Sequence, residues 1–333
     1  GYENIRVNEV QKNGAFFIGT QRLDHSVKEM TFEVNSLPAI KDDGYIWDVD
    51  DYRSTVTFQF VGVHFPYSTY RSFANTWTDI DKRLMENETF GKQLRVSNLL
   101  KDELANVTKG ELGDVEKLTA ILNLVKYKVK WNDENRLYVK SVRGALKDGV
   151  GSSADMNALL ICLLQDAGFE AYPVVMSLRS NGRIIPLYAT YDKLNYFIAG
   201  VTIGDKSYYM DASSKYGAVN IIPVGCMVEN ARAVYKDKPG KWVDLHEIGK
   251  GIDVHIVTAQ FDENGVLTGS VIGNSRGVYS MLMCSAYSKK KDQEEYVDEL
   301  KARYKVEISD FEMNGCDDKR LIQQAFSFEN EEI

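Results

Sequence analysis

The sequence is short of the side chains that most often perform acid–base and metal chemistry. Only four histidines occur in its 333 residues, at His25, His64, His246 and His255, and none lies within residues 69–240. His is the usual general base near neutral pH, so this scarcity narrows the mechanisms open to the middle of the chain. His246 and His255 have no partners at metal-ligand spacing. We therefore expect neither a metal site nor another cofactor.

Cysteine is equally scarce, and its four positions are far apart. Cys162, Cys226, Cys284 and Cys316 form no Cys-x-x-Cys spacing, which argues against the common zinc motifs. Cys162 has apolar neighbours and is predicted to be a small buried hydrophobe. One disulfide among the other three is compatible with the sequence, which does not place it.

Long apolar runs and basic stripes are also missing. No stretch of 18 apolar residues occurs, so we expect no membrane span. The net charge is −8 and the isoelectric point about 5.2, which argues against nucleic acid as a partner. The chain begins at Gly1 without Met or a signal peptide. We therefore expect a trimmed chain, from which an export signal could have been removed.

The patterns that are present divide the chain into three predicted domains. Residues 1–68 have β character, with a hairpin turn predicted at Lys12-Asn13-Gly14 and alternation over residues 52–62. They are interpreted as a β-sandwich that lacks its first strand. Residues 69–240 carry helices and then strands. Residues 241–333 return to β character and are interpreted as a truncated C-terminal domain.

Helix signals organise the first half of the middle domain. Thr78 and Asp81 fit a capping box, and Ser141 and Gly149 bracket a short helix as its caps. An apolar stripe at helical spacing predicts a longer helix between these positions: Val115, Leu118, Ile121, Leu122 and Val125.

Residues 151–168 are the most informative stretch of the chain. A glycine turn delivers a short polar side chain, Ser153, to the start of a helix. Residues 158–164 are apolar on every side, so the helix is predicted to be enclosed by its domain. Ser152 and Asp155 resemble a capping box at its start.

Two later strands are predicted to form one polar site with this helix start. Residues 195–203 and 206–212 are joined by a two-residue turn, and the resulting register makes Tyr196 and Asp211 diagonal neighbours on one face. Their backbones then lie roughly 7–8 Å apart. A base at position 196 could be oriented by the carboxylate of Asp211, and a nucleophile at the helix start would complete an acyl-transfer triad.

This frame resembles the transglutaminase-like family, which shares the papain-type fold. The family pattern is Gly-x-Cys-x-Asp opening an apolar helix, then a strand carrying His and a strand ending in Asp. Here the frame has three parts: Gly151-Ser152-Ser153-Ala154-Asp155, Leu194-Asn195-Tyr196 and Tyr209-Met210-Asp211-Ala212-Ser213. The resemblance implies Ser153 at the nucleophile position, Tyr196 at the base position and Asp211 as the orienting acid. Two of the three therefore differ from the catalytic set.

The flanks resemble a bacterial three-part architecture, in which such a core lies between two β-sandwich domains of unknown function. Residues 35–53 are typical of the preceding domain, and residues 131–138 and 177–183 of a branch whose core lacks Cys and His. The fold class implied is α+β, a transglutaminase-like (papain-type) core with N- and C-terminal β-sandwich domains. The resemblance also implies a periplasmic or cell-surface location.

The two replacements weaken the expected chemistry. A thiol has a pKa near ~8.5 that a helix start can lower, whereas a serine hydroxyl needs a strong adjacent base. A tyrosine, with a pKa near ~10, is protonated at neutral pH and donates a hydrogen bond. We therefore expect Ser153 to cap the helix, and Tyr196 to fill the former cleft and hydrogen-bond Asp211.

Four further residues are candidate binding positions. Trp131 is predicted to be either core or an aromatic wall for a ligand. Asp155 is either a first-turn charge favoured by the helix dipole or a polar group lining the cleft. Asn195 either braces neighbouring loops or faces a ligand. Arg179 is either solvated on an exposed loop or binds an anion.

Three hypotheses about function follow from these residues. The first is a non-catalytic module that binds a peptide, glycan or protein partner. The second is an amidase, peptidase or transglutaminase variant with Ser153 as nucleophile. The third is a purely structural part of a larger envelope assembly.

Overall fold

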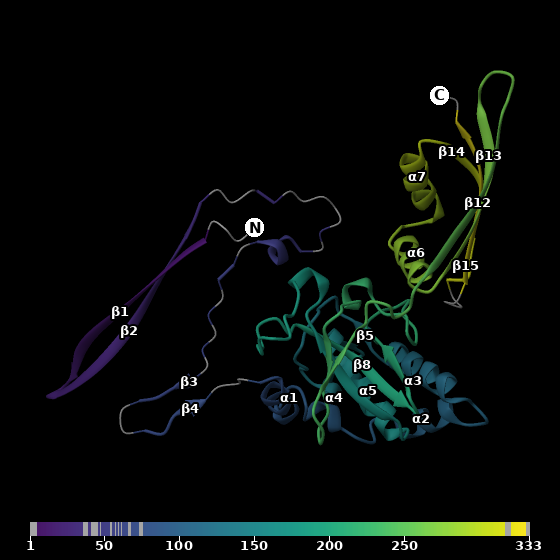
Figure 1. Cartoon of the computed structure of the whole chain (residues 1–333). Helices are drawn as coiled ribbons and strands as arrows, with labels where there is room; N and C mark the ends of the chain where they lie inside the picture. The colour runs from purple at the N-terminus through teal and green to yellow at the C-terminus, as the bar shows by residue number, and fades with distance from the viewer. Residues whose placement is uncertain are drawn as a thin grey trace. The chain divides into compact units, whose positions relative to one another are not determined.

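The computed structural model describes residues 5–35, 39–40, 46, 48–53, 55–56, 58, 60, 62–65, 68–72, 76–316 and 321–330. The chain divides into two compact units, Gly1–Ser54 and Thr55–Ile333. Its helices and its mainly antiparallel sheets, labelled in Figure 1, give the mixed α+β class expected from the sequence.

The first unit contains a long two-stranded hairpin. Strand β1 (Ile5–Ile18) pairs antiparallel with β2 (Gln21–Val34), and Ile18 lies opposite Gln21. A short 3-10 helix, η1 (Val49–Tyr52), follows.

The hairpin turn predicted at Lys12-Asn13-Gly14 is wrong. These residues lie inside β1, where Gly14 pairs with His25. The turn is made instead at Gly19, whose φ of +62° is a left-handed conformation that glycine adopts without strain. Within the described part of residues 1–54 the strands form this one sheet, and the expected sandwich is not formed there.

Residues 35–53 were interpreted as typical of the domain that precedes the core. Many of them lie outside the described residues. The alternation over residues 52–62 also falls partly outside them. Among the described residues of that stretch, strand structure is confined to β3 (Gly62–Val63), which pairs with β4 (Arg71–Ser72).

A five-stranded antiparallel sheet forms the centre of the second unit, in the order β11-β10-β7-β8-β9. Ile203 pairs with Lys206 across the two-residue turn, as predicted. The last strand begins at residue 241, so the sheet continues past the domain boundary expected at residue 240. The strands are β7 (Glu170–Met176), β8 (Tyr196–Ile203), β9 (Lys206–Met210), β10 (Ala231–Ala233) and β11 (Lys241–Val243).

Helix α5 (Ser153–Asp166) covers one face of this sheet (Figure 1), and all its side chains from Ser153 to Leu164 are buried. The prediction of an enclosed helix is therefore confirmed, because apolar residues on every side of a helix need protein on every side. Strand residues alternate between the two faces: Val175 and Phe197 join the core around α5, whereas Val174 and Ile198 join a second core on the opposite face.

Two helices pack against α5, α3 (Asp114–Lys128) and α4 (Val142–Asp148), and α2 (Lys101–Thr108) packs in turn against α3. The predicted stripe of α3 is buried except for Val115, which is 39% exposed. The predicted caps of α4 are confirmed, since the Ser141 hydroxyl accepts from Gly144 N and Gly149 adopts φ +66°.

Short elements connect these helices and strands. Strand β5 (Lys130–Trp131) pairs in parallel with β6 (Val150–Gly151). The remaining 3-10 helices are η2 (Gln93–Arg95), η3 (Arg179–Asn181) and η4 (Val224–Cys226).

Helix α1 (Trp77–Glu86) begins two residues earlier than predicted. Its capping box is formed by Thr76 and Asp79, not by Thr78 and Asp81. Asp81 is 3% exposed because it pairs with the guanidinium of Arg232 on β10 through two hydrogen bonds of 2.7 and 2.6 Å. This buried ion pair attaches α1 to β10, the second strand of the sheet.

The C-terminal part of the second unit is one four-stranded antiparallel sheet, ordered β12-β13-β15-β14. Its core residues Tyr296, Leu300, Ile308 and Phe326 join one helix to one face of the sheet. The expected second sheet of a sandwich is not found among the described residues. The elements are β12 (Ile252–Phe261), β13 (Leu267–Arg276), α6 (Val278–Ser288), α7 (Gln293–Tyr304), β14 (Glu307–Asn314) and β15 (Leu321–Asn330).

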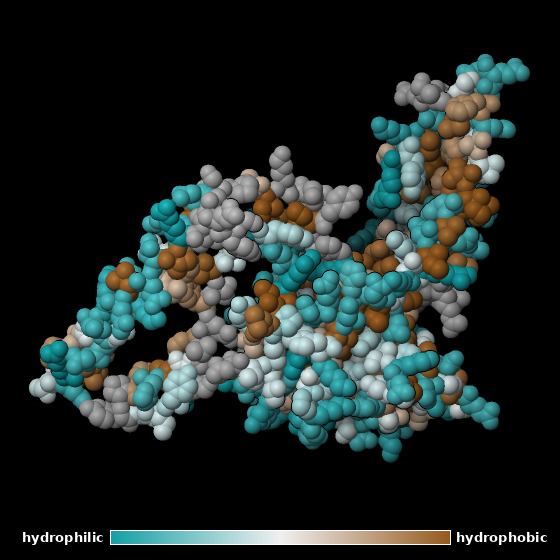
Figure 2. All heavy atoms as spheres, viewed as in Figure 1, coloured by the Kyte–Doolittle hydropathy of each residue, from teal (hydrophilic) through white to brown (hydrophobic). Residues whose placement is uncertain are grey.

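The other face of this sheet is apolar and exposed. Ile252, Val254 and Ile256 of β12 are at least 48% exposed, and Ile272 of β13 is 52% exposed. Hydrophobic side chains are visible over this sheet in Figure 2. The sheet is also cross-linked, because Cys284 of α6 forms a disulfide with Cys316 after β14. The disulfide that the sequence left unplaced is thus assigned.

None of the helices in the described residues is long and apolar enough to cross a membrane.

The buried ion pair predicts a large loss of stability when one partner is removed. Asp81→Ala leaves the Arg232 charge buried without its partner, so we expect the free energy of unfolding to fall by about 3–5 kcal/mol in urea titrations. Glu170→Ala is the matched control, because it breaks the exposed pair with Lys238 and should cost about 0–1 kcal/mol. Equal losses in the two variants would contradict this assignment.

Candidate functional site

The start of α5 is organised by the carboxylate of Asp155, which is 4% exposed. Oδ2 accepts hydrogen bonds from the backbone N and the hydroxyl of Ser152, at 3.0 and 2.7 Å. Oδ1 accepts from the backbone N of Lys140 and of Ser141, at 2.8 and 3.0 Å. One carboxylate thus closes the predicted capping box and also fixes the segment that leads into α4. Asp155 lies in the first turn of α5, as the first of the two predicted roles requires, and it also holds the segment before α4 in position.

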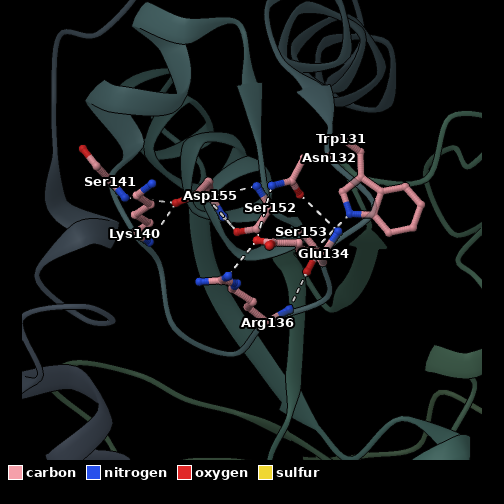
Figure 3. Close-up of polar contacts among 9 residues, drawn as sticks. All are labelled: Trp131, Asn132, Glu134, Arg136, Lys140, Ser141, Ser152, Ser153 and Asp155. Atoms are coloured by element: carbon pink, nitrogen blue, oxygen red, sulfur yellow. Dashed lines mark hydrogen bonds and ion pairs between the residues drawn. The ribbon is translucent and has the colours of Figure 1, made fainter.

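Ser152, and not Ser153, is the N-cap of α5, because its hydroxyl accepts from Asp155 N. Ser153 is the first helical residue, and both of its polar groups are bound to the segment that precedes α4 (Figure 3). Its backbone N donates to Glu134 O at 3.0 Å, and its hydroxyl accepts from Arg136 N at 3.1 Å. The side chain is 0% exposed. The expectation that Ser153 itself caps the helix is therefore wrong.

Residues 131–136, which we call the closing loop, are held in place by their own polar contacts (Figure 3). The backbone oxygen of Glu134 also accepts a hydrogen bond from Trp131 Nε1 at 3.1 Å. The side-chain carboxylate of Glu134 forms an ion pair with Arg136 at 2.8 Å. Asn132 N donates to Gly151 O at 3.0 Å, which joins the loop to the start of α5. Trp131 is 39% exposed and belongs to this loop, so it is not part of the core.

A second cluster surrounds Asp211, which is 1% exposed. The hydroxyl of Tyr196 donates to Asp211 Oδ2 at 2.8 Å and lies 2.9 Å from the hydroxyl of Ser213. Asp211 Oδ1 accepts from the backbone N and the hydroxyl of Ser213, at 2.9 and 2.7 Å. The hydrogen bond expected between Tyr196 and Asp211 is therefore present, as the strand register required.

Asn157 joins this second cluster to α5. Its Nδ2 donates to Asp211 Oδ1 at 3.1 Å and to Phe197 O at 3.0 Å, while its Oδ1 accepts from Ala212 N at 2.8 Å. Ser153 and Asn157 are four residues apart and so lie on the same side of the helix. The frame residues Ser153, Tyr196 and Asp211 are thus attached to one helix face, although no hydrogen bond joins Ser153 directly to Tyr196 among the contacts described.

Burial sets the protonation of this cluster. Burial raises the pKa of Tyr196 well above its ordinary value, and the negative charge of Asp211 raises it further. Burial likewise raises the pKa of the Cys226 thiol, again with a contribution from Asp211. Both groups are therefore neutral at pH 7, and Tyr196 acts there as a hydrogen-bond donor.

The two remaining candidates brace a neighbouring segment. Asn195 Oδ1 accepts from Leu178 N at 2.9 Å, and Asn195 N donates to Met176 O at 3.1 Å. Arg179 Nε donates to Met227 O at 2.6 Å, and partial burial lowers the pKa of its guanidinium. These contacts give Asn195 the loop-bracing role that the sequence offered as one of two alternatives. Arg179 is half-buried and bonded to backbone, so it is not freely solvated.

Sequence reasoning missed two features of the site. The first is the closing loop, for which Asn132-Asp133 gave a turn signal, since Asp133 adopts φ +65°. The second is Cys226, which lies in the core around Tyr196 and for which the sequence held no signal. Within the described residues, no group of three His, Cys, Asp or Glu side chains could hold a metal ion.

The sequence matches no protein-family model and no curated protein. Among solved structures, the chain is similar to a putative protease from Parabacteroides distasonis, with 8% identity and a TM-score of 0.43. That similarity covers 99% of this chain and 64% of the other, so the chain spans less than two thirds of its length. A putative cysteine protease from Cytophaga hutchinsonii has 12% identity, a TM-score of 0.27 and coverage of 73% and 76% of the two chains.

The Asp211 cluster predicts a stability effect for the single hydroxyl of Tyr196. Tyr196→Phe removes its hydrogen bonds to Asp211 and Ser213, so we expect the free energy of unfolding at pH 7 to fall by about 1.5–3 kcal/mol. Tyr127→Phe is the control, since Tyr127 is 83% exposed on α3 and the change should cost less than about 0.5 kcal/mol.

The same variant has a predictable pH dependence. The folded-state pKa of Tyr196 lies above that of an unfolded phenol, near ~10. Its contribution is therefore fully present below about pH 10 and is lost as the pH rises through the folded-state value. Denaturant titrations at rising pH should show a smaller alkaline loss in Tyr196→Phe than in the parent protein. An identical alkaline loss in both would contradict the assignment.

Proposed function

We propose that this chain is a non-catalytic member of the transglutaminase-like family, with a papain-type core in the three-part bacterial architecture. It acts as a binding or scaffold module for a peptide, glycan or protein partner. Support for the family comes from the sequence frame around Ser153, Tyr196 and Asp211. Ser153 begins α5, Tyr196 begins β8, and Asp211 directly follows the adjoining strand β9. The resemblance places the family's catalytic residues on the same elements.

The contact between Ser153 and the closing loop carries the non-catalytic part of the proposal. Acyl transfer needs hydrogen-bond donors aimed at the developing oxyanion, and the backbone N–H of a nucleophile at a helix start is suited to this role. Here the Ser153 N–H donates to Glu134 O, and the hydroxyl accepts from Arg136 N. The groups that would receive a substrate carbonyl are therefore occupied by the protein's own backbone.

The position of Tyr196 supports the same conclusion. A serine nucleophile needs an adjacent base that can take its proton. The Tyr196 hydroxyl is protonated at neutral pH and donates to Asp211, so it supplies a donor where catalysis requires an acceptor. Both side chains are at most 3% exposed, which leaves a substrate no direct approach to them.

Amide-hydrolysis assays test this proposal. With γ-glutamyl-p-nitroanilide and a fluorogenic peptide mixture, we expect the parent protein and Ser153→Ala to give the same background rate, because Ser153 does not act as a nucleophile. Turnover by the parent that disappears in Ser153→Ala would overturn the proposal and favour the alternative, an amidase, peptidase or transglutaminase variant that uses Ser153.

A restoring variant sharpens the same test. Ser153→Cys combined with Tyr196→His supplies the missing thiol and imidazole, yet we expect no turnover, because Glu134 O still occupies the Ser153 N–H. The introduced thiol should also resist Ellman's reagent in the native protein. Ser207→Cys, at an exposed position of β9, is the control that should react fully. Rapid labelling of Ser153→Cys would show an open path to the site.

We also propose that the protein works outside the cytoplasm, at the periplasm or cell surface. The disulfide between Cys284 and Cys316 supports this location, because cytosolic thiols are kept reduced. The other two cysteines, Cys162 and Cys226, are free and buried.

The disulfide predicts a defined labelling pattern and a stability effect. In denaturant, iodoacetamide should label the two free cysteines before reduction and all four cysteines after it, as read by mass spectrometry. The bridged residues are 32 positions apart, so reduction should lower the free energy of unfolding of this region by about 2–4 kcal/mol. Labelling of all four without reduction, in protein recovered from the envelope of the native cell, would contradict the pairing.

A further inference from the structure

A groove of about 550 Å³ lies on the face of the five-stranded sheet that α5 does not cover. Tyr172 of β7, Tyr209 of β9 and Tyr235 after β10 contribute its aromatic part. Lys241 and Asp244, at the β11 edge, contribute its charged part. The groove therefore crosses the sheet from one edge to the other, and its size is within the range of small-ligand sites.

The groove is separate from the frame around Ser153. Tyr196 lies at the first position of β8, whereas Thr202 in the groove lies six residues further along the same strand. At the usual rise of a strand this separation is about 20 Å. A ligand in the groove would therefore be held at the opposite end of β8.

Contacts between neighbouring side chains fix the position of hydroxyl groups in the groove. The Tyr172 hydroxyl lies 3.0 Å from the Thr202 hydroxyl, and the rings of Tyr172 and Tyr235 are 4.7 Å apart. Burial raises the pKa of Tyr209 and of Tyr235, so these phenols stay protonated and can donate hydrogen bonds at neutral pH. The rings of Tyr172 and Tyr209 are only 4% and 6% exposed, so the groove offers chiefly hydroxyls that both donate and accept, beside the half-buried ring of Tyr235.

The charges of the groove argue against anionic and apolar ligands. Asp205 and Asp244 are exposed and outnumber Lys241, and the whole chain carries a net charge of −8. An anion would therefore be repelled. The exposed carboxylates and the ammonium group would lose hydration against an apolar ligand, which costs free energy.

The edge of the sheet argues against an added peptide strand. β9 is an edge strand, and its backbone at Tyr209 is already satisfied by Asn220. Tyr209 N donates to Asn220 Oδ1 at 2.9 Å, and Asn220 N donates to Tyr209 O at 2.8 Å. A peptide that binds by strand addition needs these backbone groups to be free.

We infer that the groove binds a neutral oligosaccharide, whose hydroxyls would bond to the carboxylates and phenol hydroxyls while its C–H groups contact the exposed edges of the half-buried Tyr235 and Trp242. This inference names the ligand class of the binding module proposed above and rests on that proposal. The two fail separately, because the amide-hydrolysis assay tests Ser153 and the saccharide-binding assay tests Tyr235.

Calorimetry and the fluorescence of Trp242, which lines the groove, test the inference on the full chain. The probes are neutral hexasaccharides: cellohexaose, maltohexaose, mannohexaose, xylohexaose and hexa-N-acetylchitohexaose. We expect at least one to bind saturably with a dissociation constant below about 1 mM. Tyr235→Ala should weaken that binding about tenfold, because it removes a half-buried ring and its hydroxyl.

Matched variants separate the groove from general effects. Tyr127→Ala, on the exposed side of α3, should change the affinity less than about twofold. Asp205→Ala, at the exposed turn before β9, should weaken binding without loss of folding, as checked by circular dichroism. Absence of saturable binding by all five probes, or full binding in Tyr235→Ala, would overturn the inference. So would binding of an acetylated, amidated hexaalanine peptide in place of the saccharides.

Discussion

The rest of the core depends on how α5 begins inside the protein. Its first residues are buried, so the free N–H groups at the helix start must find protein partners in place of water. Ser152 and Asp155 satisfy part of this need, and Asp155 uses its remaining oxygen to fix the segment before α4. Glu134 O satisfies the Ser153 N–H from the closing loop. The requirement that allows a buried helix to start therefore also fixes the closing loop against the first turn of α5.

The two buried clusters are linked through α5, and each is stabilised by hydrogen bonds to one buried carboxylate. Each centres on a carboxylate with most of its acceptor positions occupied, Asp155 in one and Asp211 in the other. Such a carboxylate is stable in the interior only while its donors remain. Tyr196 is one of these donors, so its hydroxyl has become part of the framework. A tyrosine at this position donates a hydrogen bond that holds the carboxylate of Asp211 in place.

The parts of the fold that follow from periodicity were predictable from the sequence. The enclosed α5, the caps of α4 and the register of β8 and β9 depend on local patterns, and the hydrogen bond between Tyr196 and Asp211 follows from that register. Features that depend on distant residues were not predictable. Asp81 has the spacing of a helix cap in the sequence, but in the structure it pairs with Arg232 on β10, which is 151 residues further along the chain. Asn13-Gly14 has the composition of a turn, but its long flanking strands continue through it and turn at Gly19.

The exposed edge of the C-terminal sheet has a practical consequence. β12 is an edge strand of ten residues without Lys or Pro, the residues that usually keep such an edge from pairing with another chain. Its apolar face adds Ile252, Val254 and Ile256 to the same surface. At high concentration or on warming, intermolecular strand pairing is expected to begin here, so a lysine introduced at Ile256 is the first change to make for colloidal stability.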